Sequence, residues 1–136
     1  MTERPTVPIA DDDPDILELV SFRLRRMGCE LLLARDGDEA YRLAIQQVPS
    51  VAVLDVMMPG LDGFELTRRL RGHELTAGMP ILLLTAKSQD QDVTEGFRSG
   101  IDDYVRKPFS PQELRARIQA LLDRPARREA ATVPVQ

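Results

Sequence analysis

Short apolar runs alternate along this chain with longer segments whose apolar residues recur every three or four positions. The runs span residues 6–10, 31–34, 51–54, 81–84 and 104–106. Those at 51–54 and 81–84 contain apolar residues only, which is typical of strands buried on both faces of a sheet. The pattern therefore predicts five strands.

The segments between and after the runs are predicted helices, at about residues 14–27, 39–47, 64–72, 90–99 and 111–122. The first begins at Asp13-Pro14, because aspartate is a good capping residue and proline is favoured at the first helical position. The last begins at the capping box Ser110-Pro111-Gln112-Glu113, in which serine and glutamate side chains satisfy backbone N–H groups reciprocally.

Strands that alternate with helices favour a parallel sheet with right-handed crossovers and helices on both faces. The simplest such α/β fold is flavodoxin-like and doubly wound, with five strands in the order 2-1-3-4-5 and five helices. Pro8 lies in the first strand, although proline cannot donate to a strand ladder. We expect either that this strand pairs only after Pro8 or that Pro8 faces a gap in the pairing.

The composition narrows the class of protein. The 136 residues are 43% hydrophobic and 29% charged, which is ordinary for one globular domain, and a formal charge of −4 argues against broad nucleic-acid binding. The only cysteine, Cys29, excludes an internal disulfide and favours a reducing, cytoplasmic location. No run is long enough for a membrane span, and the N-terminus lacks the apolar core of a signal peptide. We assign residues 6–123 to the domain, 1–5 to an N-terminal extension and 124–136 to a flexible tail or linker.

Polar residues follow four of the five predicted strands. They are Asp11, Asp12 and Asp13 after the first strand, Asp55 after the third, Thr85 after the fourth and Lys107 after the fifth. Because parallel strands end at one edge of the sheet, these residues are expected to converge. Clustered carboxylates repel one another unless a cation lies among them, and Mg²⁺ prefers such oxygen ligands.

This convergence changes the interpretation of Asp55. Taken alone, an aspartate after a strand caps a turn. Beside a cation it is a nucleophile suited to attack a phosphoryl group, and a lysine and a hydroxyl would contact the phosphoryl oxygens. The lysine would be Lys107 and the hydroxyl that of Thr85.

Several short motifs, taken in their order along the chain, resemble those of one known protein family. They are Asp11-Asp12, Asp55 with Met58-Pro59-Gly60 and Asp62-Gly63, Thr85-Ala86, and Gly100-Ile101-Asp102-Asp103-Tyr104 leading to Lys107-Pro108-Phe109. Over residues 6–123 the chain resembles the receiver domain of two-component response regulators. The resemblance implies a protein that accepts a phosphoryl group from a sensor histidine kinase or a phosphotransfer protein. It implies no enzymatic activity beyond the protein's own phosphorylation and dephosphorylation.

The resemblance also implies a role for each matching residue. Asp55 would be the phosphoacceptor and would bind Mg²⁺ together with Asp11, Asp12 and the backbone carbonyl of Met57. Thr85 and Lys107 would hold the phosphoryl group, and Lys107-Pro108 would be a cis peptide bond.

Two further roles in the family concern switching and lifetime. Thr85 and Tyr104 would form a switch pair, in which the hydroxyl moves toward the phosphoryl group while the aromatic ring turns inward. Met57 and Lys87 occupy positions that tune dephosphorylation, so we expect Met57→Asn and Lys87→Glu to change the lifetime of the acyl phosphate more than the fold. Asp13 matches the acidic position beside the metal pair, but a helix cap before Pro14 explains it more economically.

Other classes of site fit less well. In a calcium loop that began at Asp11, the sixth position would be Ile16 instead of glycine and the twelfth would be Phe22. A phosphatase with an aspartate nucleophile would carry a second aspartate at Met57. A flavodoxin-like cofactor site would need a hydroxyl- and glycine-rich phosphate loop after the first strand, where Asp11 to Asp13 would repel a phosphate.

The resemblance is less informative about output. The last predicted helix resembles that of receivers from winged-helix transcription factors, which often dimerise through the fourth helix, fifth strand and fifth helix. Asp103, Glu113 and Arg117 match the charge pattern of that face, whereas Val93 replaces its basic residue on the fourth helix. The chain carries no recognition helix and no apolar run long enough for a membrane span, so we expect no direct contact with nucleic acid or membrane. We favour a stand-alone receiver that binds a downstream effector protein; the alternative is the N-terminal receiver of a larger DNA-binding or enzyme-output regulator.

Overall fold

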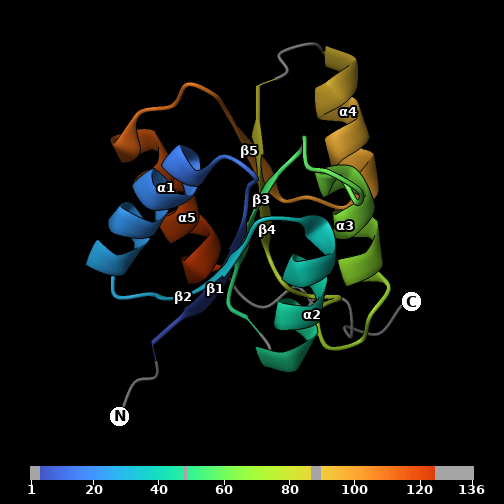
Figure 1. Ribbon diagram of the computed structural model, residues 1–136, viewed down its shortest axis with the longest axis horizontal. Coiled ribbons are helices and arrows are strands. Elements are labelled where there is room, and N and C mark those ends of the chain that lie inside the picture. The colour runs from blue at the N-terminus through green and yellow to red at the C-terminus, as the bar shows by residue number, and fades with distance from the viewer. Residues whose placement is uncertain (1–3, 48, 87–89, 125–136) are drawn as a thin grey trace.

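The computed structural model describes residues 4–47, 49–86 and 90–124 (Figure 1). Five parallel strands form one sheet in the order β2-β1-β3-β4-β5. The strands are β1 (Thr6–Ala10), β2 (Glu30–Ala34), β3 (Ala52–Asp55), β4 (Ile81–Thr85) and β5 (Asp103–Arg106), and the helices are α1 (Pro14–Arg26), α2 (Gly37–Gln47), α3 (Gly63–Arg71), α4 (Asp90–Ser99) and α5 (Pro111–Asp123). The predicted flavodoxin-like fold is confirmed.

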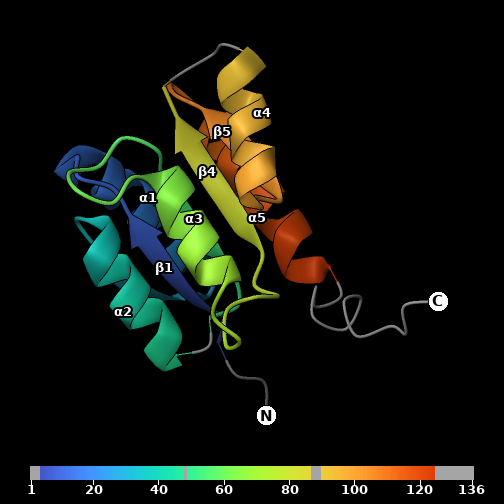
Figure 2. The same ribbon diagram turned by 90° about the vertical axis from the view of Figure 1, so that its right-hand side faces the viewer.

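The sheet lies between two helical layers, with α1 and α5 on one face and α2, α3 and α4 on the other (Figures 1 and 2). Alternate residues of β4 enter different cores: Leu82 and Leu84 pack with α1 and α5, whereas Ile81 and Leu83 pack on the opposite face. All four are buried. This explains why the run is apolar without alternation, because side chains on both faces of the strand are removed from water.

β1 tolerates Pro8, which has no N–H donor, because of how this strand pairs with β3. Ser50 N–H donates to the Thr6 carbonyl at 2.8 Å, and alternate residues of a parallel strand bond to the same neighbour, so the backbone of Pro8 also faces β3. The registered pairing of β1 with β3 begins only at Ile9, whereas β2 pairs along the whole of β1. The missing donor of Pro8 therefore falls where no registered β3 partner is present.

The helix starts are set by capping side chains. Asp13 accepts a hydrogen bond from Asp15 N–H at 2.9 Å, and Ser110 accepts one from Glu113 N–H at 3.0 Å, as predicted. The helix α2 begins two residues earlier than predicted, at Gly37. Its cap is Asp36, whose carboxylate accepts from Glu39 N–H at 2.8 Å.

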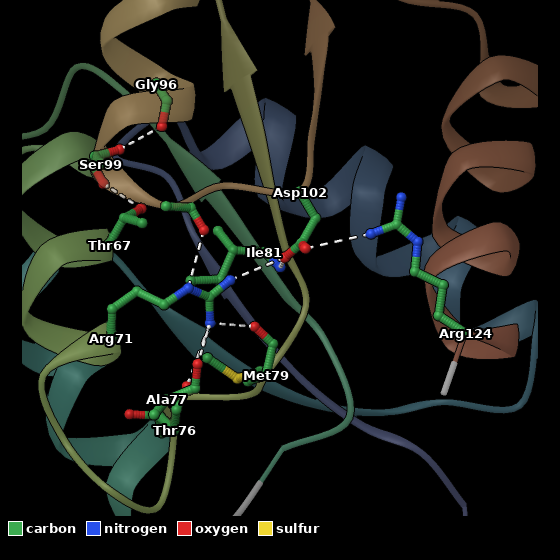
Figure 3. Close-up of polar contacts among 12 residues, drawn as sticks. Thr67, Arg71, Thr76, Ala77, Met79, Ile81, Gly96, Ser99, Asp102 and Arg124 are labelled. Atoms are coloured by element: carbon green, nitrogen blue, oxygen red, sulfur yellow. Dashed lines mark hydrogen bonds and ion pairs between the residues drawn. The ribbon is translucent and has the colours of Figure 1, made fainter. Parts of the chain in front are cut away.

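A buried ion pair joins the two loops that flank the start of β4 (Figure 3). Arg71, at the end of α3, donates to Asp102 Oδ2 at 2.9 Å and to the Gly100 carbonyl at 2.9 Å. The same guanidinium donates to carbonyls of the loop before β4, namely those of Thr76, Ala77 and Met79. Asp102 also accepts from Ile81 N–H at 2.8 Å and from Arg124 Nη1 at 3.2 Å. The loops 72–80 and 100–102 are thus fixed to one guanidinium.

Among the residues that the structure describes, no helix has both the length and the apolar character needed to cross a lipid bilayer.

Candidate functional site

The sheet brings the predicted site residues to one edge. Asp11 directly follows β1, Asp55 ends β3, and Thr85 ends β4. Asp55 pairs in register with Leu84, so Thr85 lies one residue beyond Asp55 on the neighbouring strand. Lys107 follows β5, and its backbone N–H donates to the Thr85 carbonyl at 2.8 Å. The convergence predicted from the strand order is therefore confirmed for these four residues.

The Lys107 side chain joins the two buried carboxylates. Its Nζ donates to Asp11 Oδ2 at 3.0 Å and to Asp55 Oδ1 at 3.1 Å. The side chains of Asp11 and Asp55 are 0% and 5% exposed, so most of their hydration is lost. Buried charges are tolerated when they are paired and hydrogen-bonded, and Lys107 provides that pairing.

Three carboxylates form a set of oxygen ligands. One oxygen each of Asp11, Asp12 and Asp55 lies within 4.8 Å of the others. Asp11 is held by Asp13 N–H, which donates to its Oδ1 at 2.9 Å, and Asp12 is exposed to solvent. Hard oxygen donors, one of them open to water, fit Mg²⁺, which binds through few carboxylates and keeps several waters. The predicted carboxylate ligands therefore lie close enough to share one divalent cation.

The electrostatics of the cluster disfavour the charge of Asp55. Burial and the neighbouring charge of Asp11 raise the pKa of Asp55 from 3.8 to about 6, against the opposing effect of Lys107. Burial also disfavours the charge of Lys107, but hydrogen bonds and charges of Asp11 and Asp55 outweigh it and raise the pKa of Lys107. Lys107 therefore stays an ammonium, and a further cation beside Asp55 would favour the charged form of its carboxylate.

The proposed switch residues lie beside a small cavity. Thr85 is 6% exposed, and Tyr104 on β5 is half-buried. Both line a cavity of about 10 Å³ beneath α4, together with Val56, Phe64, Leu83, Val93, Gly96 and Ile101. The peptide bond between Lys107 and Pro108 is cis, as predicted.

Met57 lies beside the site with a side chain that is largely exposed. Its carbonyl as a metal ligand stays a prediction. Lys87 lies outside the described residues.

The charged face predicted for partner binding is formed within one chain. Arg117 Nη1 on α5 donates to both carboxylate oxygens of Asp103, at 3.1 and 3.2 Å, and its Nε lies 3.7 Å from Glu113. The hydrogen bonds that Arg117 donates to Asp103, together with the negative charge of that carboxylate, raise the pKa of Arg117. Val93 lines the cavity under α4, so the position where the family places a basic residue contributes to packing here.

Sequence reasoning missed the roles of two residues near this face. Asp102 belongs to a recognised motif, but the motif did not reveal that its side chain is 2% exposed and paired with Arg71. Arg71 gave no signal at all, because its partners are carbonyls of a loop and a carboxylate 31 residues away.

The sequence matches one protein family and resembles known members of it. Residues 7–119 match the family described as "Response regulator receiver domain". The chain is 48% identical over 120 residues to the DNA-binding dual master transcriptional regulator RpaA of Synechocystis, which covers 88% of this chain and 50% of RpaA. It is 42% identical over 119 residues to the phosphate regulon transcriptional regulatory protein PhoB of Pseudomonas aeruginosa, covering 88% and 52%. The chain therefore spans about half the length of these relatives.

Solved structures agree with the sequence match. The chemotaxis protein CheY4 of Vibrio cholerae superimposes with a TM-score of 0.83 at 32% identity, covering 88% of this chain and 99% of CheY4. The receiver domain of the sensor histidine kinase PA1611 of Pseudomonas aeruginosa, solved with a magnesium ion coordinated in its active site cleft, gives 0.83 at 30% identity, covering 90% and 100%. With the matched residues spanning most of the chain and the strand order 2-1-3-4-5 in place, this protein belongs to the response regulator receiver domain family of two-component systems.

Proposed function

We propose that Asp55 is the phosphoacceptor of this receiver and that a sensor histidine kinase or a phosphotransfer protein supplies the phosphoryl group. The observation that carries the proposal is the position of the Asp55 carboxylate. It is 3.1 Å from the Lys107 ammonium and within 4.8 Å of carboxylate oxygens of Asp11 and Asp12. This combination of a buried nucleophile, a cation and a ligand set suits phosphoryl transfer better than it suits a structural role.

In the proposed reaction, an oxygen of Asp55 forms a bond to phosphorus while the bond from phosphorus to the donor nitrogen breaks. The phosphoryl group leaves the donor imidazole, which takes up a proton, and an acyl phosphate remains on Asp55. The Lys107 ammonium then contacts the added charge, and the Thr85 hydroxyl donates to a phosphoryl oxygen. Mg²⁺, held by Asp11, Asp12, Asp55 and the Met57 carbonyl, would neutralise charge on the transferring group.

The phosphoryl group would act through the switch pair Thr85 and Tyr104, which line one cavity. Their movement would change the surface of α4, β5 and α5 that an effector protein, or a second copy of the chain, contacts. Asp103, Glu113 and Arg117 would supply the charges of that surface. We propose no catalysis beyond phosphorylation and dephosphorylation of the chain itself, and a cytoplasmic location in keeping with the single cysteine.

The alternative output is a DNA-binding regulator of which this receiver is the N-terminal half. The observation that favours it is that RpaA is a DNA-binding transcriptional regulator and that the chain covers 50% of its length. In that arrangement a separate domain would contact DNA. The stand-alone receiver stays a prediction, and the length of the intact gene decides between the two.

Phosphorylation by a small donor tests the proposed function. We expect acetyl phosphate with Mg²⁺ to add one phosphoryl group to the wild-type chain, located on Asp55 by peptide mass spectrometry. Asp55→Asn should take up none, and EDTA should abolish uptake by the wild type. Asp38→Asn is the matched control, because Asp38 is an exposed carboxylate in the first turn of α2. Equal uptake by Asp55→Asn and wild type would contradict the proposal.

A further inference from the structure

The ring of Tyr104 lies against two exposed side chains. The Phe97 ring on α4 meets it edge to face, with centroids 6.1 Å apart and an interplanar angle of 84°. The guanidinium carbon of Arg106, at the end of β5, lies 5.9 Å from the centre of the Tyr104 ring. Both arrangements are attractive: edge-to-face rings pair through their quadrupoles, and a cation is drawn to an aromatic face.

The space behind the ring is too small to receive it. The cavity beneath α4 measures about 10 Å³, which is the volume needed for a single water and far below that of a phenol ring. The helix packs closely over it: a Cβ added to Gly96 would lie 2.9 Å from Ile101 Cδ1 and 3.5 Å from Leu83 Cδ1. The ring can therefore turn inward only if α4 moves away from the sheet.

We propose that Phe97 and Arg106 hold the Tyr104 ring in this outer position and thereby set how rarely the unphosphorylated protein adopts the inward state. The proposal rests on the proposed role of Tyr104 as a switch residue. It assigns Phe97 as a positioning residue that acts on Asp55 only through Tyr104. When the ring enters the cavity, it leaves the guanidinium of Arg106 and breaks the edge-to-face contact with Phe97, so both contacts stabilise one state only.

The burial of Phe97 separates this role from core packing. Phe97 is 48% exposed, so removing its ring opens no enclosed cavity and costs less hydrophobic free energy than truncating a fully buried phenylalanine. A contact made in only one of two states shifts their populations by its full strength. Removing the Phe97 ring should therefore change the balance of the switch more than the stability of the fold.

Fluorine NMR can measure the populations of the inward and outward positions of the Tyr104 ring. The chain has two tyrosines, so incorporation of meta-fluorotyrosine gives two signals, and Tyr41→Phe identifies that of Tyr104. We expect Phe97→Ala to raise the inward fraction roughly 2- to 10-fold, the range that corresponds to one edge-to-face pair. Phe97→Leu, which keeps bulk without a ring quadrupole, should give a smaller rise. The rate of phosphorylation by acetyl phosphate should rise in parallel in both variants.

Phe22→Ala is the matched control. Phe22 on α1 is also an exposed phenylalanine, 56% accessible, with an arginine guanidinium 5.6 Å from its ring centre. It lies on the opposite face of the sheet and should change neither the Tyr104 signal nor the rate.

An unchanged Tyr104 signal and rate in Phe97→Ala, with normal labelling of wild-type Asp55, would overturn the role of Phe97 and leave the proposed function intact. A wild type that takes up no phosphoryl group would instead contradict the proposed function. The fluorine signal, which needs no phosphate, would still decide whether Phe97 holds the ring.

Discussion

At the scale of single residues, the negative charge of Asp55 lowers the free energy of unfolding. The pKa of Asp55 is about 6 in the folded chain, against an ordinary value of 3.8. Between these values the folded state keeps a proton that the unfolded state has lost. The free energy of unfolding should therefore fall as the pH rises from about 4 to about 6, and stay lower above that range.

Asp55→Asn removes this destabilising charge. In buffer with EDTA at pH 7.5, we expect the variant to be more stable than wild type by about 1–3 kcal/mol, whereas at pH 4 the two should differ little. Urea unfolding at the two pH values measures the difference. Equal stability at pH 7.5 would contradict the raised pKa of Asp55.

Prediction from the sequence succeeded for residues whose place follows from strand order. Asp55 and Thr85 end parallel strands, and Asp11 and Lys107 directly follow parallel strands, so the sheet alone brings the four residues together. It failed for Arg71 and Asp102, because pairing across 31 residues depends on how two loops fold back. No local periodicity or spacing encodes such a contact.

At the scale of elements, the start of α3 supports the end of β3. A Cβ added to Gly63 would lie 2.4 Å from the Asp55 carbonyl and 2.9 Å from Val56 Cα. Neither contact can be relieved by a side-chain rotation, because both atoms belong to the backbone. Close packing of α3 on β3 therefore requires glycine at position 63.

Gly63→Ala should cost about 1–3 kcal/mol of unfolding free energy, in the range for overpacking, and should slow phosphorylation because the backbone of Asp55 must shift. Gly72→Ala is the control, since its added Cβ would find ordinary contacts at 3.5 and 3.6 Å and its φ is −82°. That variant should be neutral or slightly more stable. Similar losses in both variants would contradict the backbone clash at Gly63.

The Arg71–Asp102 pair fixes two loops and gives a second prediction at this scale. Asp102→Asn removes a charge that is 2% exposed beside a guanidinium 16% exposed, and we expect a loss of about 2–4 kcal/mol in urea unfolding. Glu95→Gln makes the same chemical change at the exposed pair with Arg68 and should cost no more than about 1 kcal/mol. A loss for Glu95→Gln as large as that for Asp102→Asn would contradict the role assigned to burial.

At the scale of the whole molecule, two cores share one sheet. Leu82 packs on the side of α1 and α5 and Leu83 on the side of α3 and α4, although they are neighbours in β4. If β4 left the sheet, apolar side chains of both cores would be exposed to water. The two layers should therefore unfold together.

We expect Leu82→Ala and Leu83→Ala each to lower the free energy of unfolding by about 2–5 kcal/mol without splitting the transition. Far-ultraviolet circular dichroism reports both layers, whereas tyrosine fluorescence reports the side on which Tyr41 and Tyr104 pack. The two transitions should coincide in Leu82→Ala, although the mutated side chain lies on the other face. Separate midpoints would show that the layers unfold independently.

The sequence predicted this architecture almost completely. Apolar runs and capping residues are local signals, and they located every strand and helix to within a few residues. The start of α2 was missed because Asp36 looks like part of a turn until Glu39 N–H is seen to bond to it.

The ammonium of Lys107 serves the site as a counterion that belongs to the chain. Three carboxylates and one ammonium leave two negative charges, which is the charge that one divalent cation neutralises. In the proposed reaction, a phosphoryl group would then add negative charge to a neutral cluster. Because a bound cation would offset the two negative charges that Lys107 leaves, we expect phosphorylation to depend on the concentration of Mg²⁺ more strongly than on that of a monovalent salt.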